Sequence, residues 1–374
     1  MQEKTKVLIV GMSSQKGGIE QFVIQFIRNA NRDEFAFDFL TFAPVCAYEE
    51  ELISYGCVIN HATRRGTNPI KSYTDQAEFF KKRGSAYDIV WLHLSSASDL
   101  STILLAKKYT DAKIACHSHG TNFESREGLI RKIHGFLHKK NQKRLRENTD
   151  IFLACSSEAG KWLYGEIGKD LIVVPNGINT DEYKFDSTKR AEIRKKLNID
   201  DKQIVLGHVG RLVEVKNHGF LLDIFFEFQK QANSIMLLIG EGELENELEN
   251  KCEDMGILSK VRFLGFRDDV ADLLQAFDVF LLPSFSEGFP ITLVEAQACG
   301  LPCLISDTIT REVDITGLVR FLSLELSAAN WAKEARNSLT NDRGSHDYIE
   351  KLTDAGYTDK ATAQLLMSIF GGIE

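Results

Sequence analysis

Short apolar segments alternate with helical patterns along the chain. In the first half, each apolar segment has the length and composition of a β-strand, and these segments are residues 7–10, 37–42, 89–92, 113–115, 151–154 and 172–174. A helix-like stretch at residues 18–30 follows the first of them. Continuous apolar runs indicate strands that are buried on both faces, and their alternation with helices predicts a parallel sheet covered by helices.

The same pattern begins again after a pause in the middle of the chain. A charged stretch from Asp181 to Asp201 contains one predicted helix, at residues 189–197, and little apolar core. Strand-like segments then lie at residues 204–209, 235–239, 261–263, 279–282 and 302–305, with helical patterns at 219–231, 244–255, 270–276 and 291–299. We predict two α/β domains, residues 1–178 and 179–374. The last helix, at residues 359–370, is left open between packing on the second domain and packing back on the first.

Composition narrows the classes of function. A chain of 374 residues suits two domains. Its 45 Lys and Arg against 53 Asp and Glu give a net charge of −8, so the basic surplus of a nucleic-acid-binding protein is missing and no nucleic acid is expected. The seven scattered cysteines indicate a reducing cytoplasm. No apolar run approaches the roughly 20 residues of a membrane span, so we expect a cytoplasmic protein, at most peripheral on the inner face of the membrane.

Two cations follow the first predicted strand of the second domain. Gly210 lets the chain turn at the end of this strand, and Arg211 and Lys216 lie in the loop before the next helix. Arginine offers a planar fork of donors and lysine a point charge, so the pair suits a diphosphate at the carboxyl edge of the sheet. On spacing alone, two solvated surface charges explain the pattern equally well.

A predicted helix start follows the strand at residues 279–282. Gly288 and Pro290 mark it, with Pro290 near the first helical position, and free backbone N–H groups there form an anion site. Glu295 lies on the first turns of this helix, where a carboxylate can accept hydrogen bonds from a ribose. Each carboxylate taken alone has a simpler explanation. Glu295 could only provide a favourable negative charge near a helix N-terminus, and Glu287 could be an ordinary carboxylate of a loop.

These motifs occur in an order that resembles a known family. Gly-Arg-Leu-x-x-x-Lys at residue 210 is followed by Gly-Glu-Gly at 240, Val-x-Phe-Leu-Gly at 261, Ser-x-x-Glu-Gly-Phe-Pro at 284, Glu295, and Gly-Leu-Pro at 300. The order resembles the C-terminal half of glycosyltransferase family 4, whose members are retaining enzymes. The resemblance implies the GT-B fold, an α/β architecture of two Rossmann-like parallel-sheet domains that face each other across a cleft.

The resemblance also implies catalytic roles. Arg211 and Lys216 would bind the donor diphosphate and neutralise the leaving group, Glu287 would lie near the transferred sugar, and Glu295 would hold the ribose. The family works without a bound metal. We therefore expect no metal and no cofactor, because two cations and a helix terminus can stabilise the charge on the diphosphate.

Further donor contacts are implied for the loops after the strands. The residues implied to approach the sugar and phosphates are Gly17, Gly18, Gly210, Gly288, Phe289, Pro290 and Ile291. The residues implied to lie beside the base are Phe263, Gly265 and Phe266. The Gly17-Gly18 pair follows the first strand and opens a helix, like the glycine-rich loop of the family, although a Gly-Gly pair by itself is also an ordinary turn.

A histidine-rich segment follows the strand at residues 113–115. Members of the family place a histidine here, near the donor sugar, and we align it with His119 because Gly-Thr-Asn follows it; His117 is the second choice. Histidines with a core or hydrogen-bonding role remain an alternative. A metal site made by Cys116, His117 and His119 is not expected, because no further ligands cluster nearby and side chains two positions apart are taken to diverge along the strand.

The stretch from Arg126 to Arg146 is strongly basic, with eight Lys and Arg and the single acid Glu127. Its apolar residues follow helical spacing. In an acidic protein, one basic amphipathic element indicates contact with anionic lipid headgroups, as in family members that build lipid-linked glycans. A helix that packs on the core with a solvated basic face is the alternative.

The implied reaction moves a hexose-type sugar from a nucleoside diphosphate sugar, UDP-linked, to a glycan or polyprenyl-linked acceptor, as in bacterial capsular and exopolysaccharide synthesis. A nucleotide-sugar epimerase on the same fold, which acts on the donor alone, is one alternative. A non-catalytic partner subunit is another. It predicts the loss of Arg211, Lys216, Glu287 or Glu295, all of which are present.

Overall fold

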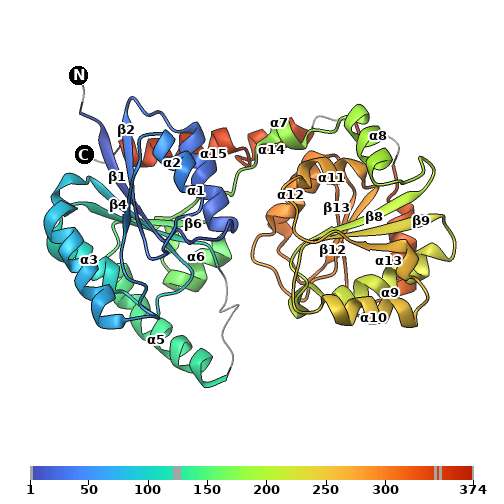
Figure 1. The fold of residues 1–374 in the computed structure, drawn as a ribbon, viewed down its shortest axis with the longest axis horizontal. Helices are drawn as coiled ribbons and strands as arrows, with labels where there is room; N and C mark the ends of the chain where they lie inside the picture. The colour runs from blue at the N-terminus through green and yellow to red at the C-terminus, as the bar shows by residue number, and fades with distance from the viewer. Residues whose placement is uncertain (1–2, 121–127, 341–342, 345–347, 373–374) are drawn as a thin grey trace. The chain divides into compact units, whose positions relative to one another are not determined.

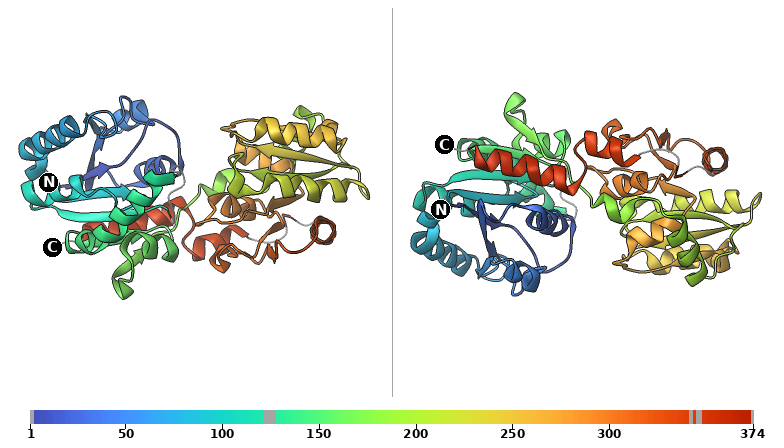
Figure 2. Two further views of the ribbon diagram at one scale, coloured as in Figure 1. Left: turned by 90° about the horizontal axis from the view of Figure 1, so that it is seen from below. Right: turned by 90° about the horizontal axis from the view of Figure 1, so that it is seen from above.

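The chain folds into two compact units in the computed structural model, which describes residues 3–120, 128–340, 343–344 and 348–372. Residues 1–177 and 359–374 belong to the first unit, and residues 178–358 to the second. The first unit ends at residue 177 and the second begins at residue 178, within one residue of the predicted boundary. The last helix, α15 (Asp359–Gly371), packs against α1 (Gly18–Asn29), so of the two packings left open for this helix the structure has the one on the first unit, and the second unit ends before α15 (Figure 1 and Figure 2).

A sheet of seven parallel strands forms the centre of the first unit, in the order β3-β2-β1-β4-β5-β6-β7. The strands are β1 (Thr5–Val10), β2 (Phe35–Thr41), β3 (Val58–His61), β4 (Ile89–Leu94), β5 (Lys113–Ser118), β6 (Ile151–Ala154) and β7 (Leu171–Val173). The first six follow the 3-2-1-4-5-6 order of doubly wound sheets. The winding direction reverses between β1 and β4, and in such sheets ligands bind beyond this switch point.

The second unit repeats this order in a sheet of six parallel strands, β10-β9-β8-β11-β12-β13. The strands are β8 (Ile204–Val209), β9 (Ser234–Ile239), β10 (Val261–Phe263), β11 (Val279–Leu282), β12 (Cys303–Ser306) and β13 (Val319–Leu322). The switch point of this sheet therefore lies between β8 and β11.

Helices accompany the strands of both sheets, and most of them form crossovers between parallel strands. In the first unit they are α1, α2 (Glu49–Ser54), α3 (Pro69–Arg83), α4 (Ser101–Tyr109), α5 (Gly128–Glu147), α6 (Ser157–Tyr164) and α15. In the second they are α7 (Thr180–Tyr183), α8 (Ser187–Lys196), α9 (His218–Gln229), α10 (Glu245–Asp254), α11 (Val270–Ala276), α12 (Ile291–Ala298), α13 (Ala328–Asn337) and α14 (Tyr348–Asp354).

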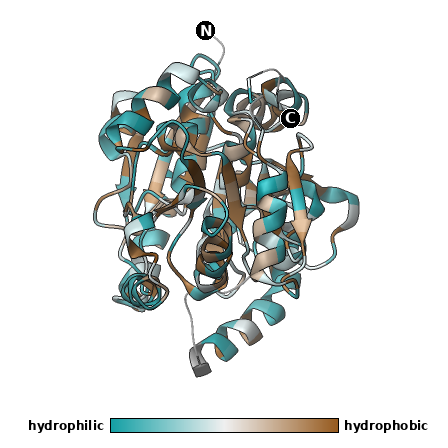
Figure 3. Cartoon of the chain, turned by 90° about the vertical axis from the view of Figure 1, so that its right-hand side faces the viewer, coloured by the Kyte–Doolittle hydropathy of each residue, from teal (hydrophilic) through white to brown (hydrophobic). Residues whose placement is uncertain are grey.

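The core lies on both faces of each sheet. All six residues of β9 and all four of β11 are buried, which explains why their sequences are continuously apolar. Figure 3 shows the same division, with hydrophobic strands inside and hydrophilic outer helix faces. The seven cysteines are free and buried, so they act as small apolar side chains. None of the helices in the described part of the chain is long and apolar enough to cross a membrane.

Candidate functional site

Two loops of the second unit leave neighbouring strands at the switch point of its sheet. The first follows β8 and contains the 3-10 turn η3 (Glu214–Lys216), and the second runs from β11 to α12. Two hydrogen bonds join the loops: the Phe285 N–H donates to the Val215 carbonyl at 2.8 Å, and the Asn217 side-chain amide donates to the Pro283 carbonyl at 3.2 Å. The strand order thus brings together two segments that are far apart in the sequence.

A lysine and a glutamate meet where these loops touch. The Lys216 Nζ lies 2.7 Å from Oε1 of Glu287, and the Ser284 hydroxyl donates to the same oxygen at 2.6 Å. Only 16% of the Lys216 side chain and 11% of the Glu287 side chain are exposed, so water screens their attraction weakly. An ammonium has three N–H donors, and those not directed at Glu287 remain available to a ligand. Arg211, on the same loop, has an exposed side chain.

Glycines allow the loop after β8 to lie against the loop after β9. Gly240 has a φ of +131°, and a Cβ at this position would lie 2.1 Å from the Gly210 carbonyl oxygen. The Gly210 N–H in turn donates to the Ile239 carbonyl at 2.9 Å. A side chain at Gly240 would therefore clash with backbone in a conformation that L-residues rarely adopt.

Helix α12 begins at Ile291, as predicted. Pro290 is its N-cap, in an extended conformation, and directly precedes the first helical position. Its carbonyl accepts the first helical hydrogen bond, from the Leu293 N–H at 3.0 Å. The Phe289 ring stacks on Tyr357, with ring centres 5.2 Å apart, so this side chain packs within the unit and its backbone borders the helix start.

Glu295 on α12 has a partner that the sequence pattern did not indicate. The Tyr183 hydroxyl, at the end of α7, donates to Glu295 Oε1 at 2.8 Å. Burial raises the pKa of the Glu295 carboxyl from its ordinary 4.5 to about 7, although the hydrogen bond from Tyr183 lowers it. A tyrosine 112 positions away carries no local signal of this contact.

The three predicted base-side residues have different environments. Phe263 packs against the apolar cluster of the core. Gly265 has a φ of +66°, and its carbonyl accepts a hydrogen bond from the Gly240 N–H at 2.9 Å. Phe266 is 60% exposed, and its backbone N–H donates to Glu241 Oε1 at 3.2 Å. Phe266 is thus the base-side residue that offers a large apolar surface.

The glycine-rich loop of the first unit is fixed by a buried carboxylate. Gly17 is the N-cap of α1, and the Glu20 side chain accepts hydrogen bonds from the Ser13 N–H at 2.8 Å and the Gly17 N–H at 3.2 Å. Glu20 is only 5% exposed. A Cβ added at Gly18 would meet no atom within 4 Å, so the loop is open at Gly18. A glutamate three residues after a helix cap is a recognised sequence signal of such a cap.

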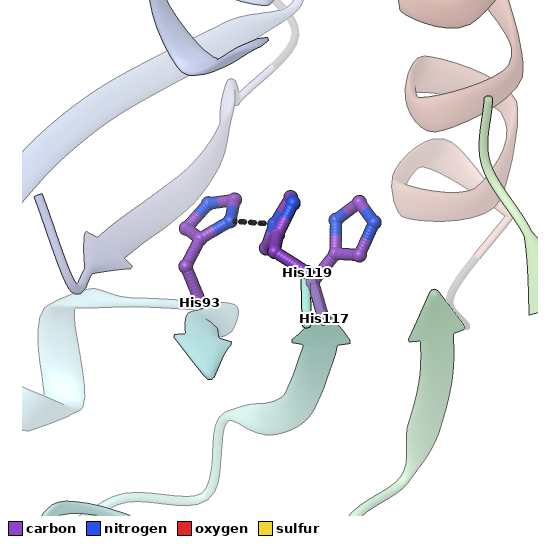
Figure 4. A group of neighbouring side chains, drawn as sticks. All are labelled: His93, His117 and His119. Carbon is purple, nitrogen blue, oxygen red and sulfur yellow. Dashed lines mark hydrogen bonds between the residues drawn. The ribbon is translucent and has the colours of Figure 1, made fainter. Parts of the chain in front are cut away.

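Three histidines gather at the carboxyl ends of β4 and β5. His93 Nδ1 lies 2.7 Å from His119 Nε2, and the ring centres of His117 and His119 are 4.2 Å apart (Figure 4). Burial lowers the pKa of His119 to about 3 and holds the pKa values of His93 and His117 well below the ordinary value, so all three are neutral.

This cluster corrects two premises of the sequence analysis. His117 and His119 do not diverge, because positions i and i+2 face the same side of an extended chain. A further histidine, His93, does cluster with them, because β4 and β5 pair with His93 opposite His117. Cys116 points elsewhere and accepts a hydrogen bond from the Thr149 hydroxyl at 3.3 Å.

Comparison with known proteins places this geometry in a family. The model described as Glycosyltransferase Family 4 matches residues 16–182, and the model described as Glycosyl transferases group 1 matches residues 189–352. EpsF of Bacillus subtilis (strain 168), which is named as a glycosyltransferase, is 31% identical over 376 residues, covering 98% of this chain and 96% of EpsF. The chain belongs to glycosyltransferase family 4.

Other relatives and solved structures agree with this assignment. The UDP-Gal:alpha-D-GlcNAc-diphosphoundecaprenol alpha-1,3-galactosyltransferase of Escherichia coli is 30% identical over 246 residues, covering 64% of this chain and 62% of that enzyme. Anabaena HepE in complex with UDP has a TM-score of 0.77 at 17% identity, covering 99% and 100% of the two chains. A glycosyltransferase from Rickettsia africae has a TM-score of 0.79 at 15% identity, covering 98% of each chain. This likeness shows that the family 4 chain has the GT-B fold.

The basic stretch of this family 4 glycosyltransferase lies largely on α5, and its residues 126 and 127 lie outside the described part. One side of α5 is fixed to the first unit: the Ala97 N–H donates to His138 Nδ1, and His138 Nε2 donates to the Trp162 carbonyl, both at 2.9 Å. Away from His138, Ile133 is 49% exposed and Phe136 is 66% exposed. The exposed basic residues of the helix are Arg131, Lys132, Lys139, Lys140, Lys143 and Arg144.

Proposed function

We propose that this family 4 glycosyltransferase is a retaining hexosyltransferase that uses a UDP-linked sugar and a glycan or polyprenyl-linked acceptor in cell-surface polysaccharide synthesis. The observation that carries the proposal is the Lys216–Glu287 pair at the switch point of the second sheet. One relative is named for UDP-Gal and a diphosphoundecaprenol acceptor, and HepE was solved with UDP, which supports this choice of donor and acceptor class.

The donor diphosphate is assigned to the loop after β8. In the transition state, negative charge grows on the departing diphosphate. The partly buried Lys216 ammonium, the exposed Arg211 guanidinium and the start of α12 provide fixed positive charge and N–H donors for it. These groups supply the electrostatic stabilisation without a metal ion, so we propose metal-independent transfer.

Glu287 is assigned to the sugar. Its Oε1 is held by Lys216 and Ser284, which fixes the carboxylate beside the diphosphate-binding lysine. An oxocarbenium-like sugar carries positive charge, and a fixed carboxylate stabilises it more than the neutral ground state. In this proposal the acceptor attacks from the face that the leaving group departs, and the phosphate accepts the acceptor proton, so the anomeric configuration is retained.

Glu295 and His119 complete the assignment. Glu295, which already accepts a hydrogen bond from Tyr183, is assigned to the ribose hydroxyls. His119, whose Nε2 is hydrogen-bonded to His93, is assigned to the hydroxyls of the transferred sugar. As a neutral imidazole, His119 can act as either donor or acceptor for a sugar hydroxyl.

The α5 surface is assigned to the membrane. Exposed Phe136 and Ile133 beside six exposed basic residues suit the boundary between anionic headgroups and acyl chains. A polyprenyl-linked acceptor is confined to that boundary, so peripheral binding at the inner face of the membrane would bring enzyme and acceptor together.

One turnover experiment separates this proposal from its competitors. The purified chain is incubated with UDP-glucose, UDP-galactose or UDP-N-acetylglucosamine, with and without a polyprenyl-diphosphate-sugar acceptor, and the products are separated by chromatography. A transferase releases UDP in proportion to the glycosylated acceptor, and the anomeric proton coupling of the product shows retention. Interconversion of the sugars without UDP release would identify an epimerase. The absence of any turnover, with nucleotide binding also absent, would identify a partner subunit.

A further inference from the structure

The histidine cluster of the first unit has the composition of a metal site. His93 and His117 are register partners on β4 and β5, and His119 follows two positions after His117, so rigid parallel strands present two of the imidazoles. One ring nitrogen from each histidine lies within 4.8 Å of those of the other two. In the view of Figure 4, the His119 ring lies between the rings of His93 and His117.

Several nitrogens of the cluster lack hydrogen bonds to the described residues. His117 is fully buried, yet neither its Nδ1 nor its Nε2 has a partner there, and neither has His93 Nε2. Leaving a buried polar atom unpaired destabilises the folded state. The surroundings do not explain these atoms, because the aromatic rings of Phe22 and Trp91 pack around the histidines. Unpaired nitrogens in one apolar pocket point to a ligand that imidazole nitrogen can bind.

We propose that His93, His117 and His119 bind a divalent transition-metal ion of the zinc class. Neutral imidazole is the commonest metal ligand in proteins and suits Zn²⁺, Cu²⁺, Ni²⁺ and Co²⁺, whereas Mg²⁺ and Ca²⁺ prefer oxygen ligands. Three histidines with an open fourth position form a known zinc arrangement.

The geometry requires only small movements. Zn–N bonds of about 2.0–2.1 Å in a tetrahedron place ligand nitrogens about 3.3 Å apart. The His93 and His119 nitrogens, at 2.7 Å, would separate slightly, and the His117 ring would approach. No carboxylate belongs to the cluster among the described residues, so the ion would keep its full charge and favour an anionic fourth ligand, such as hydroxide or a phosphate oxygen.

Metal binding would also affect catalysis. An ion bound by the His119 nitrogen that faces His93 would turn the His119 ring and place a charged ion with its fourth ligand beside the residue assigned to the sugar, so bound Zn²⁺ should inhibit transfer. This consequence rests on the proposed function, whereas the binding itself does not.

The test is a metal titration of the full chain, freed of metal by chelation and dialysis. Co²⁺ is added first, because its visible absorption reports tetrahedral nitrogen coordination, and Zn²⁺ is then titrated in competition. We expect one equivalent of Co²⁺ to give the tetrahedral spectrum and Zn²⁺ to abolish it. His117→Gln and His119→Gln should each weaken binding at least tenfold. His61→Gln should bind like the wild type, because His61 lies apart from the cluster, beside Glu49.

Folding of each variant is checked by circular dichroism. If His117→Gln does not fold, His119→Gln, at a partly exposed position, decides the test. The absence of a one-equivalent Co²⁺ spectrum in the wild type would overturn the proposal and leave a hydrogen-bonded histidine network. Binding that survives both cluster substitutions would also overturn it, because the ion would then lie elsewhere. Neither readout depends on nucleotide or sugar, so failure here is distinguishable from failure of the transferase proposal.

Discussion

The Lys216 ammonium lies 2.7 Å from the Glu287 carboxylate, although 71 positions separate the two residues. Their loops leave β8 and β11, the neighbouring strands at which the winding of the sheet reverses. Each residue partly compensates the charge of the other, and Ser284 holds the carboxylate from a second direction. In the proposed reaction the two have separable tasks, since Lys216 acts on the diphosphate and Glu287 on the sugar.

Replacement of Glu287 tests this separation. Glu287→Gln keeps the size of the side chain and an oxygen for Ser284 but removes the charge that would stabilise the oxocarbenium-like sugar. We expect kcat for transfer to fall by about 100-fold or more, a loss typical of a removed transition-state contact. The Kd for UDP should change by less than about threefold, because free UDP lacks the sugar. Steady-state kinetics and isothermal titration calorimetry measure the two effects. A variant with full kcat would remove Glu287 from the mechanism.

The raised pKa of Glu295 predicts a pH-dependent stability. The folded state holds this proton up to a pKa of about 7, whereas the unfolded chain loses it near 4.5. Between these values the folded state binds more protons, so the stability of the protein falls as pH rises through this window. Above pH 7, Glu295→Gln should therefore be more stable than the wild type, by about 1–3 kcal/mol, and the difference should shrink toward pH 4.5.

Urea unfolding at pH 5, 6, 7 and 8 measures this difference. The matched control is Glu253→Gln, a substitution at an exposed glutamate of α10, which should leave the pH profile unchanged. A Glu295→Gln advantage that is constant across the four pH values would show that Glu295 does not titrate in this range.

Alanine substitutions at two glycines with positive φ compare the effect of backbone strain alone with that of strain and a steric clash. Gly256→Ala adds a Cβ that meets no atom within 4 Å, so its cost is the conformational one, about 1–2 kcal/mol. Gly240→Ala adds at least that strain, because its φ of +131° lies beyond the left-handed region, and it also places the Cβ 2.1 Å from the Gly210 carbonyl oxygen. We expect Gly240→Ala to lower Tm by clearly more than Gly256→Ala and to weaken UDP binding, because it displaces the loop of Lys216. Equal Tm losses would contradict the close packing of these loops.

The α5 surface predicts lipid selectivity. Each Lys or Arg near an anionic surface contributes about 1 kcal/mol to binding. The double substitution Lys139→Glu/Lys140→Glu should thus nearly abolish sedimentation with phosphatidylglycerol vesicles, which the wild type should bind more weakly at high salt. Phosphatidylcholine vesicles are the control lipid. Lys81→Glu/Lys82→Glu, on α3, is the matched protein control, because both residues are exposed. Equal binding of wild type and the α5 variant would exclude this helix as the contact.

The strands that the sequence predicted include every strand of the two sheets except β3 and β13. β8 and β11 begin and end at the predicted residues, because strands covered on both faces have uninterrupted apolar sequences. The bounds of β10, an edge strand, were also predicted. The edge strands β3 and β13 were not predicted. In β3 no residue is fully buried, and in β13 the exposed Arg320 interrupts the pattern, so neither carries a continuous apolar signal.

The residues of the candidate site also divide into those that motif order indicates and those that meet only in the folded chain. Motif order was sufficient to single out Lys216, Glu287 and Glu295. Tyr183 and His93 could not be found in that way, because each meets its partner only through the fold: one through packing of α7 on α12, the other through the register of β4 and β5. The contact between His117 and His119 could have been predicted, because side chains two positions apart on a strand face the same side.

The most direct test of the account is a thermal shift of the full chain with UDP, GDP, ADP and CMP at about 1 mM. A nucleotide present at about 100 times its Kd stabilises the folded state by about 2.7 kcal/mol. We predict that UDP raises Tm of the wild type and of Lys189→Ala, a control lysine paired with half-buried Asp272, by a few degrees. Lys216→Ala should lose most of this shift. No shift with any nucleotide, or an undiminished UDP shift in Lys216→Ala, would contradict the assignment of the donor site to the loop after β8.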